Sequence, residues 1–106
     1  LASLGAVADT SKVATFGMSA GGYLAAQTAR LLVLEGIPLK LQVSIAPMVK
    51  PHGGTQSLLR CGGHDWNLLL NSYAWTVYLP GDDGELANDW TVNLLVDPPG
   101  EHIIKC

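Results

Sequence analysis

The sequence predicts an α/β fold built on a parallel strand–helix–strand unit. Two short β-prone runs, Lys12–Phe16 and Leu39–Val49, flank an apolar helical segment at Gly21–Glu35. A strand, a helix and a second strand joined by connections of this length form a right-handed crossover, which makes the two strands parallel. Because both strand runs are almost continuously apolar, we expect helices to cover both faces of the sheet.

The first strand leads into a glycine-rich turn that reads Gly17-Met18-Ser19-Ala20-Gly21, and the helix follows at once. In this strand–turn–helix context the pattern Gly-x-Ser-x-Gly predicts a serine held on a tight, strained turn. We expect a side chain at Gly17 or Gly21 to clash across the turn. The helix N-terminus would direct N–H groups and a positive dipole end toward an oxyanion formed at Ser19.

The helix Gly21–Glu35 has little polar surface, so we expect it to be largely buried. Gly36 and Pro38 are predicted to end it, because glycine readily closes a helix and proline cannot continue one. After the second strand, Lys50–His64 is predicted to be a glycine-rich loop.

A second helix is predicted for Asp65–Leu79, with Asp65 as its N-cap residue. Its apolar residues follow the helical i, i+3, i+4, i+7 rule at Trp66, Leu69, Leu70, Tyr73 and Val77. The turn Pro80–Gly84 ends this helix, and the remainder is predicted to be irregular. Four aromatic residues are predicted to belong to the core, with the alternative that some of them line a substrate pocket: Trp66, Tyr73, Trp75 and Tyr78.

Composition excludes several classes of protein. A chain of 106 residues with 48% hydrophobic content predicts at most one domain with a buried core. The net charge is −3 and the six Lys and Arg residues stand singly, so we expect no nucleic-acid partner. The longest apolar candidate for a membrane span, Tyr23–Leu34, is interrupted by polar residues. Cys61 and Cys106 fit no metal-binding pattern and leave the presence of a disulfide open.

Ser19 is the candidate nucleophile, and the alternative is an ordinary serine that caps a helix. A serine nucleophile needs a base to take its proton and a group to orient that base. The chain order expected for this turn is serine, acid, then histidine, and Asp97 with His102 is the one compact pair in that order. The alternative for this pair is two solvated loop residues.

Two further stretches resemble catalytic elements without fitting them. His52-Gly53-Gly54 is similar to the His-Gly-Gly element that supplies oxyanion N–H groups in lipases and esterases. That element lies upstream of the nucleophile, whereas here it follows the second strand, so a plain glycine loop is predicted. Cys61 has no electropositive neighbours in the sequence and is predicted to be structural or inert.

The segment Ser11–Ala26, the strand end Ile45–Met48 and the stretch Trp75–Pro80 together resemble the α/β-hydrolase fold. The likeness is closest to the hormone-sensitive-lipase-like esterases, the alpha/beta hydrolase fold-3 group. It implies hydrolysis of a small-molecule carboxylic ester through an acyl-enzyme on Ser19, with the N–H of Ala20 in the oxyanion hole. It implies no cofactor and no metal. Met18 departs from the Asp or Glu usual in that group.

The resemblance also implies that residues 1–106 are a partial, central segment of a hydrolase domain. The oxyanion loop of the group would precede Leu1, and its acid and histidine would follow Cys106. Two strands and two apolar helices cannot cover their own faces, and both sheet edges would be open. We therefore expect little or no turnover from these residues alone. The alternative is a non-catalytic α/β segment that binds a partner chain or self-associates through exposed apolar faces and open sheet edges.

Overall fold

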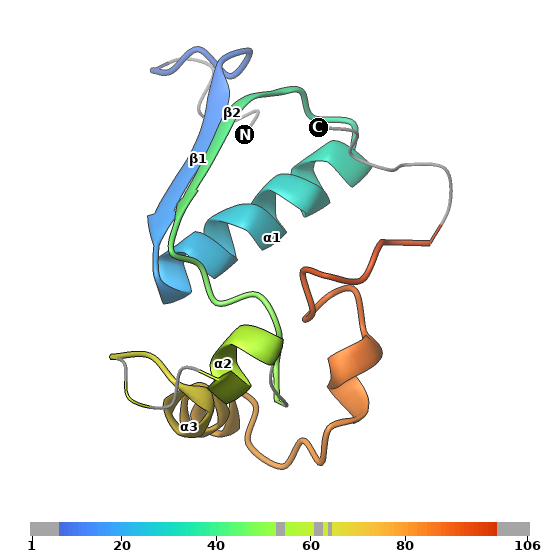
Figure 1. Cartoon of the computed structure of the whole chain (residues 1–106). Helices are drawn as coiled ribbons and strands as arrows, with labels where there is room; N and C mark the ends of the chain where they lie inside the picture. Colours follow the sequence, from blue (N-terminus) through green and yellow to red (C-terminus); the bar gives the residue numbers. More distant parts are fainter. Residues whose placement is uncertain (1–6, 53–54, 61–62, 64, 100–106) are drawn as a thin grey trace. The chain divides into compact units, whose positions relative to one another are not determined.

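The computed structural model describes residues 7–52, 55–60, 63 and 65–99 (Figure 1). The chain divides into two compact units, a first unit of Leu1–Pro47 with Pro99–Cys106 and a second unit of Met48–Pro98. The first unit holds the strand–helix–strand segment and the second unit holds the remaining helices. In chain order the elements are β1 (Val13–Met18), α1 (Ala20–Leu34), β2 (Leu39–Ile45), α2 (Gln56–Arg60), α3 (Leu68–Tyr78) and the 3₁₀ helix η2 (Glu85–Asn88).

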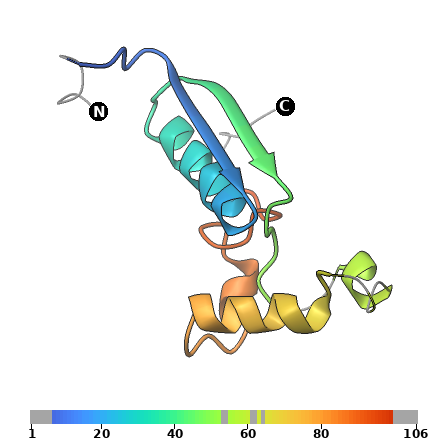
Figure 2. The same cartoon turned by 90° about the vertical axis from the view of Figure 1, so that its left-hand side faces the viewer.

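In the first unit, β1 and β2 form a two-stranded parallel sheet connected by α1. Figure 2 shows the two strands side by side with α1 along one face. The predicted parallel strand–helix–strand unit is therefore confirmed. β1 runs beyond the predicted Phe16, because Gly17 and Met18 still pair with Ser44 and Ile45 of β2.

The second strand ends earlier than predicted, at Ile45 rather than Val49. Ala46 has a φ of 45°, which turns the backbone out of the extended conformation. Pro47 follows and has no N–H to continue the ladder. The strand therefore stops level with the end of β1.

One face of the sheet packs against α1, and the opposite face is exposed. The side chain of Ser44 faces α1, because its hydroxyl is hydrogen-bonded to a helix carbonyl. Side chains alternate along a strand, so Val43 and its pairing partner Phe16 point to the opposite face. That outer face is apolar and exposed, with Phe16 72%, Met18 65% and Leu41 59% accessible. The expectation that both faces are covered is therefore wrong for the part of the chain that the structure describes.

Helix α1 ends as predicted. Gly36 has a φ of 75° and its N–H donates to the carbonyl of Val33, while the N–H of Ile37 donates to that of Leu32. This pair of bonds is the Schellman motif, which satisfies two carbonyls at a helix end. The prediction that this helix is largely buried is wrong, since Leu24 and Leu31 are about half exposed. Its buried face instead includes Tyr23, Gln27, Ala29 and Arg30.

In the second unit, α3 is shorter than predicted and is capped by Asn67 rather than Asp65. The face it buries is the opposite of the predicted one. Leu69, Tyr73 and Val77 are between 63% and 78% exposed, whereas Asn71 and Trp75 are buried. The two sets lie nearly half a turn apart on the helix. Because α3 is apolar almost all round, its sequence pattern could not decide which face would be covered.

The two short helices of the second unit were not predicted. α2 lies inside the segment predicted as a loop, and η2 lies in the stretch predicted as irregular. Both are about one turn long, which is below the length at which apolar periodicity is visible. No helix of the described residues is long and apolar enough to cross a membrane.

Candidate active site

The candidate site is the turn between β1 and α1, which Ser19 occupies. Ser19 is the N-cap residue of α1, with backbone angles of φ 56° and ψ −124°. A positive φ is rare for a residue with a Cβ atom and costs about 1–3 kcal/mol, so surrounding contacts have to hold it. Strain of this kind concentrates at functional sites. The strained turn predicted from the sequence is therefore present at Ser19.

Two backbone hydrogen bonds hold Ser19 in this geometry. Its N–H donates to the carbonyl oxygen of Ile45, at 2.9 Å, and its carbonyl oxygen accepts from the N–H of Tyr23, at 3.1 Å. The first bond extends the sheet ladder past Met18, and the second begins the ladder of α1. Ser19 thus belongs to the sheet through its amide and to the helix through its carbonyl, at the carboxyl end of β1.

The close approach of strand and helix at this turn depends on two glycines. A Cβ atom on Gly17 would stand 1.9 Å from the carbonyl oxygen of Gly21, which no real structure tolerates. A Cβ atom on Gly22 would lie 3.2 Å from the carbonyl oxygen of Gly17 and 3.3 Å from that of Ile45. At Gly21 a Cβ atom would meet no described atom within 4 Å, so the clash predicted there is wrong.

The geometry of Ser19 differs from that of an ordinary helix cap. An ordinary N-cap residue has an extended backbone, and its side-chain oxygen accepts a hydrogen bond from the first turn. Asn67 shows this arrangement at α3, with φ −136° and a 3.1 Å bond from the N–H of Leu70. Ser19 has a positive φ, makes no side-chain capping bond and is exposed. These observations argue against the capping alternative.

Ala20 is the first residue of α1 and is exposed beside Ser19. The first N–H groups of a helix have no partner within the helix, and they form the positive end of its dipole. The first turn of α1 carries no acidic residue that would offset this charge. Negative charge that develops beside the Ser19 side chain would therefore meet a favourable field.

Two of the three histidines that could serve Ser19 as a base, His64 and His102, lie outside the described residues, so the Asp97–His102 pairing stays untested. Cys61 and Cys106 also lie outside them, so the disulfide stays open. Asp97 itself is exposed. Among the described residues of the first unit there is no histidine. These residues therefore provide no imidazole base for Ser19.

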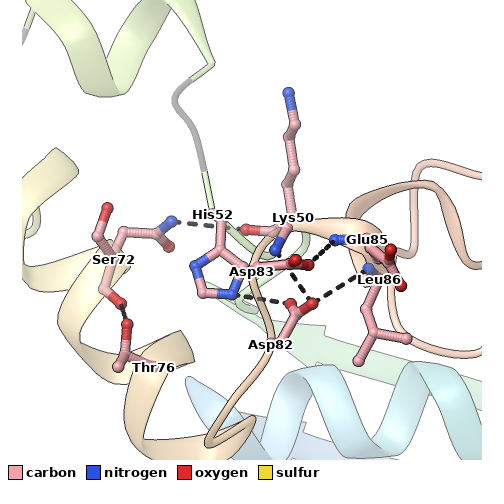
Figure 3. A network of polar contacts seen from close by, with 10 residues as sticks. Lys50, His52, Ser72, Thr76, Asp82, Asp83, Glu85 and Leu86 are labelled. Carbon is pink, nitrogen blue, oxygen red and sulfur yellow. Dashed lines mark hydrogen bonds and ion pairs between the residues drawn. The ribbon is translucent and has the colours of Figure 1, made fainter.

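His52, the histidine that the structure describes, has a partner that sequence analysis missed (Figure 3). Its Nε2 lies 3.0 Å from Oδ2 of Asp82, whose side chain is only 4% exposed. The other oxygen of Asp82 accepts the backbone N–H groups of Gly84 and Leu86, at 3.1 and 3.3 Å. The pair joins the segment after Pro51 to the turn before η2, within the second unit.

No sequence signal could have found this pair. His52 and Asp82 lie in different loops, and neither loop has a hydrophobic period that would place it. The backbone of His52 has a φ of 41°, an unfavourable conformation for a residue with a Cβ atom. Gly53 and Gly54 lie outside the described residues, so the predicted glycine loop is not tested there.

The aromatic residues of the second unit divide into core and surface. Trp75 is fully buried, and its ring meets that of Tyr78 edge-on with centroids 5.9 Å apart. Trp66, Tyr73 and Tyr78 are exposed, so the core prediction is correct for Trp75 and wrong for the other three. A cavity of about 470 Å³ between α2 and α3 is lined by Leu58, Leu59, Asn67, Leu68, Leu69 and Ser72.

Hydrogen bonds lower the pKa of two carboxylates, and neither carboxylate belongs to the turn at Ser19. The hydroxyl of Ser11, together with Lys12, lowers the pKa of Asp9, which lies before β1 at the opposite end of the strand. The hydroxyl and N–H of Thr91 lower the pKa of Asp89 in the second unit. Within the described ranges, no group of three or more His, Cys, Asp or Glu residues could hold a metal ion.

A parallel strand–helix–strand unit with a strained, exposed serine between strand and helix defines an α/β protein of the hydrolase type. Comparison with protein-family models agrees, because residues 2–102 match the alpha/beta hydrolase fold. The chain therefore belongs to this family, as the resemblance in its sequence implied. Searches of curated proteins and of solved structures give no match.

Proposed function

We propose that this chain carries the nucleophile of a serine hydrolase that cleaves carboxylic esters. The observation that supports this most is the backbone of Ser19, which is strained to a φ of 56° while its side chain is exposed and makes no capping bond. A serine that only capped the helix would relax into the extended conformation. Membership of the alpha/beta hydrolase fold family supports the reaction class, and the choice of esters follows from the sequence resemblance.

In this proposal the hydroxyl oxygen of Ser19 attacks the ester carbonyl carbon while a base takes the hydroxyl proton. The carbonyl oxygen becomes an oxyanion, and the N–H of Ala20 donates a hydrogen bond to it at the positive end of α1. Collapse of this intermediate expels the alcohol, which takes up a proton, and leaves an acyl group on Ser19. Water then attacks the acyl group and releases the carboxylic acid.

We place the base, its orienting acid and a second oxyanion donor outside residues 1–106, which makes this chain a partial hydrolase domain. Removing the base from a serine enzyme typically costs several orders of magnitude in rate. The 106 residues alone should therefore turn over esters slowly or not at all.

The test is covalent labelling with a fluorophosphonate, which reacts with activated serines, on the longest chain that the gene encodes. We expect one adduct, located on Ser19 by peptide mass spectrometry and absent from Ser19→Ala. Ser57→Ala is the matched control, because Ser57 is also an exposed serine at the start of a helix, α2. An unlabelled Ser19 in a folded full-length chain would reject the enzyme proposal. Parallel assays with p-nitrophenyl esters and anilides separate esterase from amidase activity.

A second candidate function is binding of a partner chain or self-association. The observation that favours it is the outer face of the two-stranded sheet, where Phe16, Met18, Leu41 and Ile45 are between 46% and 72% exposed. Each strand also has an unpaired edge within the described sheet. Exposed apolar patches of this kind mark interaction surfaces.

Sedimentation of the 106-residue chain over a range of concentrations tests this candidate. We expect association that weakens in Phe16→Thr and Leu41→Thr, which remove apolar surface and keep β propensity. Leu95→Thr is the control, because Leu95 is exposed in the second unit. A monomer at every concentration would contradict self-association.

A further inference from the structure

A chain of two hydrogen bonds connects β2 to the first turn of α1. The side-chain Nε2 of Gln42 donates to Oγ of Ser44, at 2.5 Å, and the hydroxyl of Ser44 donates to the carbonyl oxygen of Gly22, at 2.7 Å. The acceptor, Gly22, lies in the helical turn that begins at Ser19. No motif in the sequence predicts a role for Gln42 or Ser44.

The direction of the bonds follows from the number of protons available. A serine hydroxyl has one proton to donate and two lone pairs that accept. Because the amide of Gln42 donates to the oxygen of Ser44, the hydroxyl proton is left for Gly22. Hydrogen bonds arranged in such a chain polarise and strengthen one another. Gln42 therefore orients the Ser44 hydroxyl toward the helix.

Gly22 lies close to both strands. A Cβ atom there would lie 3.2 Å from the carbonyl oxygen of Gly17 in β1 and 3.3 Å from that of Ile45 in β2. At the same end of β2, the carbonyl oxygen of Ile45 accepts the N–H of Ser19, at 2.9 Å. Two consecutive residues of β2, Ser44 and Ile45, thus hold the helix side and the strand side of the turn that carries Ser19.

We infer that Ser44 is a positioning residue for the chemistry at Ser19, and that Gln42 orients its hydroxyl. The hydroxyl holds the first turn of α1 against β2, which fixes the direction of the Ala20 N–H relative to the side-chain oxygen of Ser19. This inference rests on the proposed function, since it names the groups that align the same nucleophile. A misplacement of catalytic groups by about 1 Å can cost a factor of ~10² in rate, so a small movement of this turn is sufficient.

The test compares Ser44→Thr with Ser44→Val in the longest chain that the gene encodes. These two side chains have the same shape and differ by the hydroxyl group. We expect Ser44→Thr to label with fluorophosphonate at close to the wild-type rate. We expect Ser44→Val to have an inactivation rate constant about 10-fold lower, with an unchanged concentration of probe at half-saturation. Equal rate constants in the two variants would overturn the inference while the proposed function stands.

A second pair of variants tests whether Gln42 orients the Ser44 hydroxyl toward Gly22. Gln42→Glu keeps the size of the side chain but replaces its donor by a carboxylate that only accepts. The carboxylate would draw the Ser44 proton away from Gly22, so we expect slower labelling than in Gln42→Lys, which retains a donor. Equal rates in these two variants would overturn the role of Gln42 as the group that orients Ser44.

Amide hydrogen exchange gives a readout that does not depend on activity. The N–H of Tyr23, bonded to the carbonyl of Ser19, should exchange roughly 2- to 10-fold faster in Ser44→Val than in Ser44→Thr. The N–H of Ala29, farther along α1, is the internal reference for global unfolding. If wild-type Ser19 takes no fluorophosphonate label, the proposed function fails. The exchange rates of the Tyr23 N–H in Ser44→Val and Ser44→Thr then decide whether Ser44 holds the turn. Unchanged exchange at Tyr23 overturns that role.

Discussion

Gly17 lies so close to Gly21 that a Cβ atom added to Gly17 would stand 1.9 Å from the Gly21 carbonyl oxygen, whereas one added to Gly21 would meet nothing. We predict that Gly17→Ala lowers the free energy of unfolding by about 3 kcal/mol, because the two backbones would have to separate. Gly21→Ala should be neutral or stabilising by up to about 1 kcal/mol, since alanine is the better helix former. Denaturant unfolding monitored by tryptophan fluorescence measures both, and similar destabilisation by the two variants would contradict the geometry.

The strained backbone of Ser19 predicts an unusual order of stability. Glycine adopts a positive φ without steric cost, so Ser19→Gly should be more stable than Ser19→Ala by about 1 kcal/mol. Both variants lack the hydroxyl, so the comparison isolates the backbone. Thermal unfolding measures the difference. A more stable Ser19→Ala would show that the turn is not strained in solution.

Trp75 and Tyr73 test the assignment of core and surface on α3. Trp75 is completely buried, so Trp75→Ala should destabilise the second unit by about 3–5 kcal/mol through lost burial and the cavity left behind. Tyr73 is 68% exposed, so Tyr73→Ala should change the unfolding free energy by less than about 0.5 kcal/mol. Proteolysis rates at native conditions provide the measurement. The reverse order would mean that the opposite face of α3 is covered.

The neighbouring carboxylates of Asp82 and Asp83 should differ in their contribution to stability. Asp82→Ala removes the carboxylate that lies beside Nε2 of His52 and leaves the N–H groups of Gly84 and Leu86 without their side-chain acceptor, which should cost about 1–3 kcal/mol. Asp83 is exposed and accepts one backbone N–H, from Glu85 at 3.3 Å, so Asp83→Ala should cost less than about 1 kcal/mol. Equal losses in denaturant unfolding would contradict a structural role for the His52 pair.

The carboxylate of Asp89 predicts a pH dependence on the acid side. Hydrogen bonds from Thr91 place its folded pKa below its unfolded value. Its contribution to stability is therefore fully present above the unfolded pKa and is lost as the pH falls through the folded pKa. NMR titration of the carboxyl carbon should give a lower midpoint in the wild type than in Thr91→Val, which lacks the hydroxyl. Matching midpoints would mean that the hydroxyl bond does not form in solution.

The elements with strong local signals were predictable from the sequence. The strand–helix–strand order followed from β-prone runs on either side of a helical segment, and the end of α1 followed from Gly36. The strained turn at Ser19 followed from glycines between a strand and a helix. In each case the residues that decide the structure are close together in the chain, so steric and hydrogen-bonding rules apply directly.

Features that depend on distant residues could not be predicted in this way. The cap of α3 was assigned to Asp65, because two polar residues near a helix start are equally plausible until the backbone of Asn67 is known. The buried face of α3 was also assigned wrongly, since an apolar helix can cover either side. The His52–Asp82 pair joins two loops that follow no period.

The sequence by itself therefore determined where the serine turn lies, which elements flank it and to which family the chain belongs. Only the tertiary structure decided that Gly22, rather than the predicted Gly21, permits the close approach together with Gly17, and that Ser44 reaches the first turn of the helix. The physical reason is that local conformation depends on neighbours in the chain. The few ångströms between strand and helix depend on how the elements pack, and packing is set by residues far apart in the sequence.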